Sequence, residues 1–178
     1  SSNRTYAVRE GLKYPVSVVF LHSTLLVADA ETSRVTAFDS LGAPTKLALN
    51  LPAFQRPTGL AVDMRRERLY VADTPAHSVH VVPLDGTAPT TFGHRGGGLG
   101  EFNFPTFVAV DAAGQLFVTD AMNFRVQVFS PQLAPLRAFG ELGDAPGQLS
   151  KPKGVAVDGQ GVVYVVEGYY DVVAAFSS

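Results

Sequence analysis

Four histidines are the side chains of this sequence best suited to bind a catalytic metal ion. They are His22, His77, His80 and His94. A catalytic zinc site needs about three protein ligands that converge on the ion and leave one coordination position open. The four histidines stand in unlike sequence contexts, so their spacing does not predict that they meet.

Three aspartates, Asp63, Asp111 and Asp158, each close a short apolar run: "GLAVD", "FVAVD" and "GVAVD". If these carboxylates pointed toward a common axis, they would form a site for a cation such as Ca²⁺. The alternative is that each side chain caps the following turn with an Asx-type hydrogen bond. We expect the turn role and keep a Ca²⁺ or Zn²⁺ site as the weaker alternative, with no other cofactor.

An acid and an arginine recur five residues apart, as Asp29 with Arg34 and as Asp120 with Arg125. A catalytic residue is rarely needed in several copies, whereas a charge-assisted pair that holds a loop can be repeated. We therefore expect both pairs to be structural.

Other catalytic signatures are absent from the sequence. There is no cysteine, which excludes thiolate catalysis, disulfides and cysteine-ligated zinc. No nucleophile elbow occurs. The glycine-rich "GHRGGGLG" from Gly93 lacks the Gly-Lys-Ser/Thr of a phosphate-binding loop, so it is predicted to be a connector in which Phe102, and Leu149 in its counterpart, plug between sheets. No catalytic residue is expected.

Composition narrows the class of protein. The chain has 178 residues, 46% hydrophobic and 17% charged, with a formal net charge of −2. This predicts a packed globular domain with no global affinity for nucleic acid and no membrane span. The opening "SSNRT" is compatible with a mature N-terminus, from which we expect an extracytoplasmic or secreted protein, with the cytoplasm as the alternative.

A repeat of about 45 residues organises the whole chain. Prolines that begin matching phrases step by 42, 48 and 47 residues, from Pro15 to Pro57, Pro105 and Pro152. This period is typical of one four-stranded propeller blade. The apolar runs are short, rich in Val, Leu, Phe and Tyr, and interrupted by Gly and Pro, as expected of strands. We predict an all-β propeller of four antiparallel units, about 11–50, 51–93, 94–140 and 141–178.

The phrases "GVAVD", "YVAD" and "AMNFRVQVF", preceded by spaced glycines and a proline, resemble the NHL repeat of six-bladed propellers. The resemblance implies blades whose first strand lines a central channel. Six blades need roughly 280 residues at this period. The four units here are compatible with a closed four-blade ring, with part of a longer propeller, or with a ring of two chains. We favour the first, in which an N-terminal strand at 5–9 completes the last blade.

One face of such a propeller gathers the loops before the first strands and after the second strands. Aromatic residues, Met, Arg and Asn are enriched at recognition surfaces. The candidate binding residues on this face are Arg56, His77, His94, Arg95, Phe104, Met122, Asn123, Phe124, Lys151, Lys153, Tyr169 and Tyr170.

Three functions follow from these residues and from the resemblance. The first is a non-catalytic binding or scaffold propeller that contacts another protein, or a second copy of itself, through the loop-rich face. The second is a metal-dependent lyase or hydrolase with a site in the channel. The resemblance implies this alternative because some propeller relatives, the peptide-amidating lyases, bind zinc through converging histidines. The third is RNA binding, as in the NHL propellers of tripartite-motif proteins. Only a thin stripe of positive charge is available for it, so a nucleic-acid partner is not expected.

Overall fold

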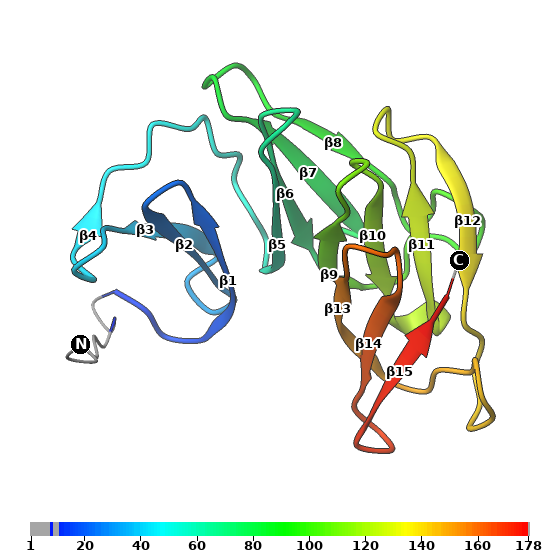
Figure 1. The fold of residues 1–178 in the computed structure, drawn as a ribbon. Coiled ribbons are helices and arrows are strands. Elements are labelled where there is room, and N and C mark those ends of the chain that lie inside the picture. Colours follow the sequence, from blue (N-terminus) through cyan, green and yellow to red (C-terminus); the bar gives the residue numbers. More distant parts are fainter. Residues whose placement is uncertain (1–7, 9–10, 178) are drawn as a thin grey trace.

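A computed structural model describes residues 8 and 11–177 of the chain. They form antiparallel sheets with the strand order of propeller blades, and Figure 1 shows the sheets side by side. Blade one is β1 (Pro15–Leu21), β2 (Thr24–Asp29), β3 (Arg34–Phe38) and β4 (Pro44–Thr45). Blade two is β5 (Pro57–Asp63), β6 (Arg68–Asp73), β7 (Ser78–Pro83) and β8 (Thr90–Phe92). Blade three is β9 (Pro105–Val110), β10 (Leu116–Asp120), β11 (Arg125–Phe129) and β12 (Pro135–Phe139). Blade four is β13 (Pro152–Val157), β14 (Val163–Glu167) and β15 (Val172–Phe176).

The predicted β-propeller architecture is confirmed, and the local sequence explains its strands. Each first strand begins at the repeated proline, and its pairing with the second strand shifts register near that proline. Proline has no N–H to donate and is tolerated at a strand start or a bulge. The fourth strands of the first three blades lie at the outer edge, and β4 has only two residues. Short outer strands limit unwanted pairing with other chains.

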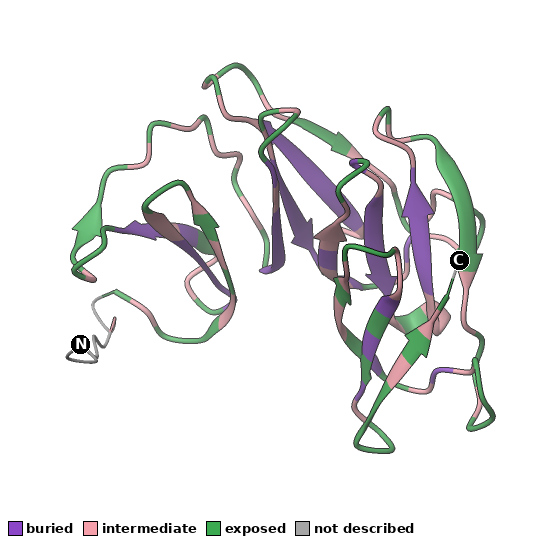
Figure 2. Cartoon of the chain, viewed as in Figure 1, coloured by how far each residue is buried: buried purple, intermediate pink, exposed green. Residues whose placement is uncertain are grey.

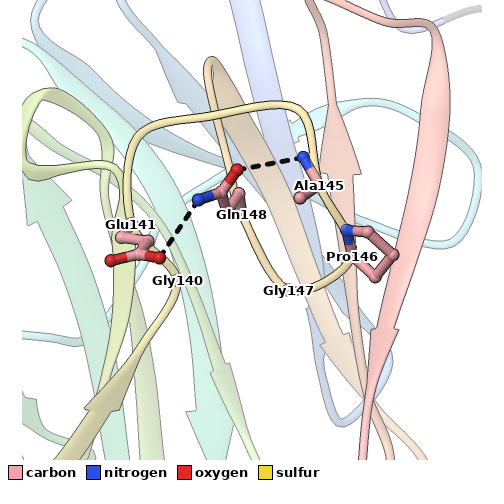
Figure 3. Close-up of a pocket in the computed structure, with 6 residues that line it drawn as sticks. All are labelled: Gly140, Glu141, Ala145, Pro146, Gly147 and Gln148. Atoms are coloured by element: carbon pink, nitrogen blue, oxygen red, sulfur yellow. Dashed lines mark hydrogen bonds between the residues drawn. The ribbon is translucent and has the colours of Figure 1, made fainter.

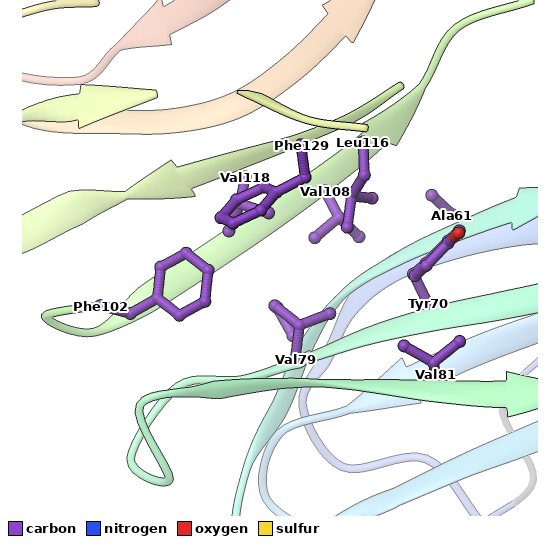
Figure 4. Close-up of a cluster of buried hydrophobic side chains, with 10 residues drawn as sticks. Ala61, Tyr70, Val79, Val81, Phe102, Val108, Leu116, Val118 and Phe129 are labelled. Carbon is purple, nitrogen blue, oxygen red and sulfur yellow. The ribbon is translucent and has the colours of Figure 1, made fainter. Parts of the chain in front are cut away.

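Hydrophobic clusters between neighbouring blades form the core. Between blades two and three, Tyr70 and Val79 pack against Val118, Phe102 and Phe129 (Figure 4). Separate clusters fill the space between blades one and two and between blades three and four. Each blade is therefore stabilised mainly by its neighbours, as in other repeat proteins.

The connectors supply the plugs that the sequence predicts. Phe102 and Leu149 are both fully buried. Phe102 lies in the cluster between blades two and three, and Leu149 lies in the cluster between blades three and four. Gly93 has φ +83° and lies against the Phe102 ring, so that a Cβ at this position would come 2.4 Å from the ring. Glycine is thus required there both for its backbone conformation and for the close approach of the ring.

The described blades form an open arc. The first strands β1, β5, β9 and β13 follow one another, and Figure 1 shows the sheet that contains β1 on the left, apart from the sheet that contains β13. The strand expected at 5–9 falls almost entirely outside the described residues, so closure by that strand stays a prediction. Within the described part of the chain, no helix has the length and apolar character needed to cross a membrane.

Candidate functional site

A buried acid at the end of each second strand holds the loop that leads into the first strand of the same blade. Asp29 Oδ2 accepts the backbone N–H groups of Lys13 and Tyr14 at 2.6 and 2.8 Å. Asp73, Asp120 and Glu167 accept equivalent backbone N–H groups in the other three blades. These carboxylates therefore fix the positions of the loops that make up the candidate binding face.

The acid in blade three carries the largest polar network. Asp120 is fully buried, and its Oδ2 accepts hydrogen bonds from Arg125 Nε at 2.9 Å, Gln127 Nε2 at 3.0 Å and Asn123 Nδ2 at 2.8 Å. The Arg125 guanidinium also donates to the carbonyls of Gly98 and Glu101 in the connector. This arginine thus ties the connector to the blade.

The pair expected in blade one is not formed. Arg34 makes no ion pair with Asp29, although both residues are described. The Asp29 carboxylate instead accepts backbone N–H groups, including those of Glu31 and Thr32, so its hydrogen-bonding capacity is already used. An identical five-residue spacing therefore gives an ion pair in one blade and a turn cap in the other.

Hydrogen bonding lowers the pKa of two of these acids. Burial by itself raises the pKa of Asp73, but the His80 imidazole, 3.4 Å away, and the backbone N–H groups of Gln55 and Arg56 together hold that pKa below its ordinary value. Burial also raises the pKa of Asp29, but the backbone N–H groups of Thr32, Lys13 and Tyr14 outweigh this effect and lower that pKa below its ordinary value. Both carboxylates are therefore favoured in the ionised form that accepts these bonds.

The three aspartates considered for a channel cation cap turns. Asp63 Oδ1 accepts the N–H groups of Arg65 and Arg66, Asp111 Oδ1 accepts that of Gln115, and Asp158 Oδ1 accepts those of Gln160 and Val162. Among residues 8 and 11–177, no three His, Cys, Asp or Glu side chains lie close enough together to hold a metal ion.

A pocket of about 450 Å³ lies on the candidate face, between blades three and four. Its walls are mainly apolar and include Phe104 and Met122, with the Lys151 and Lys153 side chains beside them. Phe104 is 39% exposed and Met122 is 53% exposed. Neither lysine forms an ion pair within the part of the chain that the structure describes. The pocket therefore combines exposed apolar surface with positive charge that has no acidic partner there.

Phe104 is held on this face in an unusual backbone conformation. Its φ is +55°, a value that residues other than glycine rarely adopt. The Phe104 N–H donates to His77 Nδ1 at 3.2 Å, and the two rings lie with their centroids 4.5 Å apart. The contacts with His77 therefore position Phe104 on this face.

The position of Ala121 in this pocket is occupied by a threonine, Thr74, in the preceding blade. There, the hydroxyls of Thr58 and Thr74 lie 2.7 Å apart and donate to the carbonyls of Thr106 and Pro105. Ala121 occupies the position of Thr74 in the next blade and has no hydroxyl. The Thr106 hydroxyl, equivalent to that of Thr58, is consequently buried without a partner among the described protein atoms.

Replacing Ala121 by threonine is expected to restore this bridge. The new hydroxyl would lie beside that of Thr106 and stabilise the fold by about 1 kcal/mol, the usual net contribution of a hydrogen bond. Thermal unfolding measures the change, which should raise Tm by roughly 2–4 °C. Ala121→Val is the matched control, since valine has the same shape without the hydroxyl. Equal Tm values for the two variants would contradict the interpretation.

The other candidate residues do not join this pocket. Arg56 lies with Tyr14 and Glu31 in a shallow hollow between blades one and two. The Tyr169 and Tyr170 rings stack edge to face at 4.8 Å in the turn after β14. His94 lies 3.4 Å from Glu101, and Arg95 bridges Phe102 through the backbone. Asn123 and Phe124 belong to the turn after β10. This turn contains a short 3₁₀ helix, η1 (Ala121–Asn123), and Phe124 is its C-cap.

A second hollow lies within the connector to blade four (Figure 3). The Gln148 side chain crosses it, accepting from the Ala145 N–H at 3.0 Å and donating to Glu141 Oε1 at 3.1 Å (Figure 3). The amide group of Gln148 thus already bonds within the connector on both sides, which favours a structural role for this hollow.

The sequence model of the NHL repeat matches residues 54–82 and 102–129, which contain the first three strands of blades two and three. Two segments of the chain thus match the NHL repeat. The match coincides with the pair of blades that share the largest aromatic core.

Solved structures share the fold of this chain. The nidogen/laminin complex has a TM-score of 0.76 and 20% identity, over 96% of this chain and 62% of that chain. Hydrazine synthase of Kuenenia stuttgartiensis has a TM-score of 0.66 and 17% identity, over 93% and 45%. An inactive variant of virginiamycin B lyase from Staphylococcus aureus, with quinupristin, has a TM-score of 0.64 and 13% identity, over 96% of this chain and 57% of that chain. The present chain therefore spans less than two thirds of each of these chains, and the likeness concerns the fold.

Sequence reasoning missed two kinds of residue in the NHL blades. Thr106 and Ala121 line the pocket, but neither side chain is charged, aromatic or a usual metal ligand, so nothing in the sequence was a reason to select them. A comparison of blades position by position would have found Ala121, where blade two has Thr74. The left-handed residues Ser33, His77, Phe124 and Asp171 were missed as turn formers, because none of them is glycine.

Proposed function

We propose that this chain is a non-catalytic binding propeller that recognises a protein partner through the pocket between blades three and four. The observation that carries the proposal is the exposed apolar pair Phe104 and Met122 beside two lysines that form no ion pair with any described residue. Aromatic and Met side chains are enriched in the centres of protein interfaces. The similarity to a propeller of the nidogen/laminin complex is compatible with this function.

The chemistry of the pocket indicates what the partner presents. An apolar side chain of the partner would pack on Phe104 and Met122 and displace water from them. A neighbouring carboxylate would lie near Lys151 and Lys153, which would favour binding at low ionic strength. We therefore propose a partner segment in which an apolar residue stands next to an acidic one.

The two methionines of the chain provide a matched test. Met122 lies in the pocket and is 53% exposed, whereas Met64 is 45% exposed in the turn between β5 and β6, on the opposite face. Met122→Asp should weaken capture of partner proteins by the immobilised chain roughly thirtyfold, the effect of losing about 2 kcal/mol at an interface hot spot. Met64→Asp should leave capture unchanged.

Quantitative mass spectrometry of the captured proteins measures both effects. Circular dichroism checks that the two variants keep the native fold, which is expected because both side chains are exposed. The proposal fails if Met122→Asp captures the same proteins as the native chain, or if Met64→Asp loses them equally.

A further inference from the structure

One backbone hydrogen bond recurs in every blade and defines equivalent positions on the candidate binding face. The residue after each closing acid donates its N–H to the carbonyl of the residue before the repeated proline. The donors and acceptors are Ala30 with Tyr14, Thr74 with Arg56, Ala121 with Phe104 and Gly168 with Lys151, at 2.9, 3.3, 3.3 and 3.0 Å. Side chains at these positions can therefore be compared from one blade to the next.

The hollow between blades one and two is built from the same positions as the pocket between blades three and four. Both are lined by the residue before the proline of one blade, the two residues after its closing acid, and the residue before the proline of the next blade. In the hollow these residues are Tyr14, Ala30, Glu31 and Arg56, and in the pocket they are Phe104, Ala121, Met122 and Lys151. The volumes are about 350 and 450 Å³. The hollow is thus a second copy of the pocket.

The two sites share an aromatic ring and a positive charge. Tyr14 in the hollow stands where the pocket has Phe104, and it is 57% exposed. Arg56 stands where the pocket has Lys151, is exposed, and forms no ion pair with any described residue. Phe104 has a blade on each side and is still 39% exposed, so the exposure of an aromatic ring at this position does not depend on the ends of the arc.

The remaining difference leaves both sites positive. Glu31 stands in the hollow where the pocket has Met122. The Glu31 carboxylate lies 3.6 Å from the Lys13 ammonium, so these two charges offset each other and the charge of Arg56 remains. The chain as a whole has a formal net charge of −2. Two positive sites on one face of a negative protein favour an acidic partner by charge complementarity.

We propose that the hollow is a second subsite for the partner segment that binds the pocket, an inference that rests on the proposed function. The segment carries two acidic residues, each next to an apolar one. One carboxylate would lie at Lys151 and Lys153, and the other at Arg56, whose planar guanidinium can donate two parallel hydrogen bonds to it. The apolar neighbour of the second carboxylate would pack on the Tyr14 ring. Tyr and Arg are both enriched at protein interfaces.

Two contacts on one segment strengthen each other. Once the pocket is occupied, the second acidic residue is held near the hollow at a high effective concentration, provided that the chain between the two contacts can span the distance. An extended chain spans at most about 3.5 Å per residue, so a short spacer cannot reach both sites. The affinity is therefore expected to pass through a maximum as the spacer is lengthened.

Synthetic fluorescent peptides test the second subsite without a natural partner. One peptide carries a single Leu-Asp pair, and a series carries two such pairs separated by about three to ten Gly and Ser residues. Fluorescence anisotropy measures the Kd of each peptide for the chain. At the best spacing, a peptide with two pairs should bind at least about tenfold more tightly than the peptide with one.

Substitutions in the hollow should remove this gain. Arg56→Glu and Tyr14→Ala are each expected to bring the two-pair peptides to the Kd of the one-pair peptide. The backbone bonds of both residues are kept, so the loop stays in place. Lys46→Glu is the control for charge, because Lys46 is exposed just after the outer strand β4, and this variant should keep the gain.

The outcomes separate the second subsite from the proposed function. If Met122→Asp weakens the one-pair peptide but Arg56→Glu keeps the gain, the second subsite is wrong and the pocket stands. The absence of a gain at every spacing would also overturn the second subsite. A one-pair peptide that binds Met122→Asp as it binds the native chain would contradict the proposed function instead. Failure of every peptide to bind the native chain would overturn both.

Discussion

Replacing Asp120 by alanine is expected to destabilise the chain by about 3–5 kcal/mol, the cost of removing one partner from a buried ion pair. The carboxylate is fully buried, and the Arg125 side chain that donates to it is only 14% exposed. Without Asp120, the guanidinium and the Gln127 amide would lose an acceptor that neither water nor another carboxylate can readily replace. The connector between blades two and three would lose its anchor too, since Arg125 also bonds two of its carbonyls.

Urea denaturation measures this loss, because urea does not screen charges as guanidinium chloride does. With a typical dependence of about 2 kcal/mol per molar, the midpoint should fall by roughly 2 M. Asp144→Ala is the control: Asp144 is exposed, and a surface substitution of this kind changes stability by less than about 0.5 kcal/mol. Equal midpoints for the two variants would show that the Asp120 network contributes nothing.

Replacing Phe102 by alanine is expected to cost about 3–5 kcal/mol for a different reason, the cavity that it leaves. The ring is fully buried between blades two and three, with its centroid 5.9 Å from that of Phe92 and 5.7 Å from that of Phe129. Strands on both sides are held by other contacts and can collapse only in part onto the space. Phe102→Leu keeps most of the volume and should cost less than about 1.5 kcal/mol.

Hydrogen exchange locates the effect of the Phe102 substitution. Amides of the connector at 93–104 should exchange faster in Phe102→Ala, while those of blade one, which lies outside this cluster, should keep their protection. Uniform loss of protection over all four blades, or none in the connector, would contradict the role of Phe102 as a plug.

The repeat made the fold predictable because every blade solves the same packing problem. The spacing of Pro15, Pro57, Pro105 and Pro152 marked the first strands, and the closing acids marked the ends of the second strands. Alternating apolar residues could be assigned to buried sheet faces without any coordinates. The resemblance to NHL repeats was based on "GVAVD", "YVAD" and "AMNFRVQVF", and the sequence matches at 54–82 and 102–129 confirm it.

The candidate site was less predictable, because it depends on differences between blades. Topology alone placed Phe104, Met122, Lys151 and Lys153 on one face, but the sequence did not show that they line one pocket together with Thr106 and Ala121. Similarly, the Asp29 and Asp120 phrases look alike in sequence. Only the local hydrogen bonds decide that Arg125 pairs with its acid while Arg34 does not.

Oxidation of the two methionines tests the proposed binding face most directly. Both are exposed to similar extents, so dilute peroxide should convert Met64 and Met122 of the free chain to sulfoxides at comparable rates. With the captured partner bound, we predict that Met122 is protected and that Met64 reacts as before. Protection of Met64 alone, or unchanged oxidation of Met122 in a saturated complex, would contradict binding at the pocket between blades three and four.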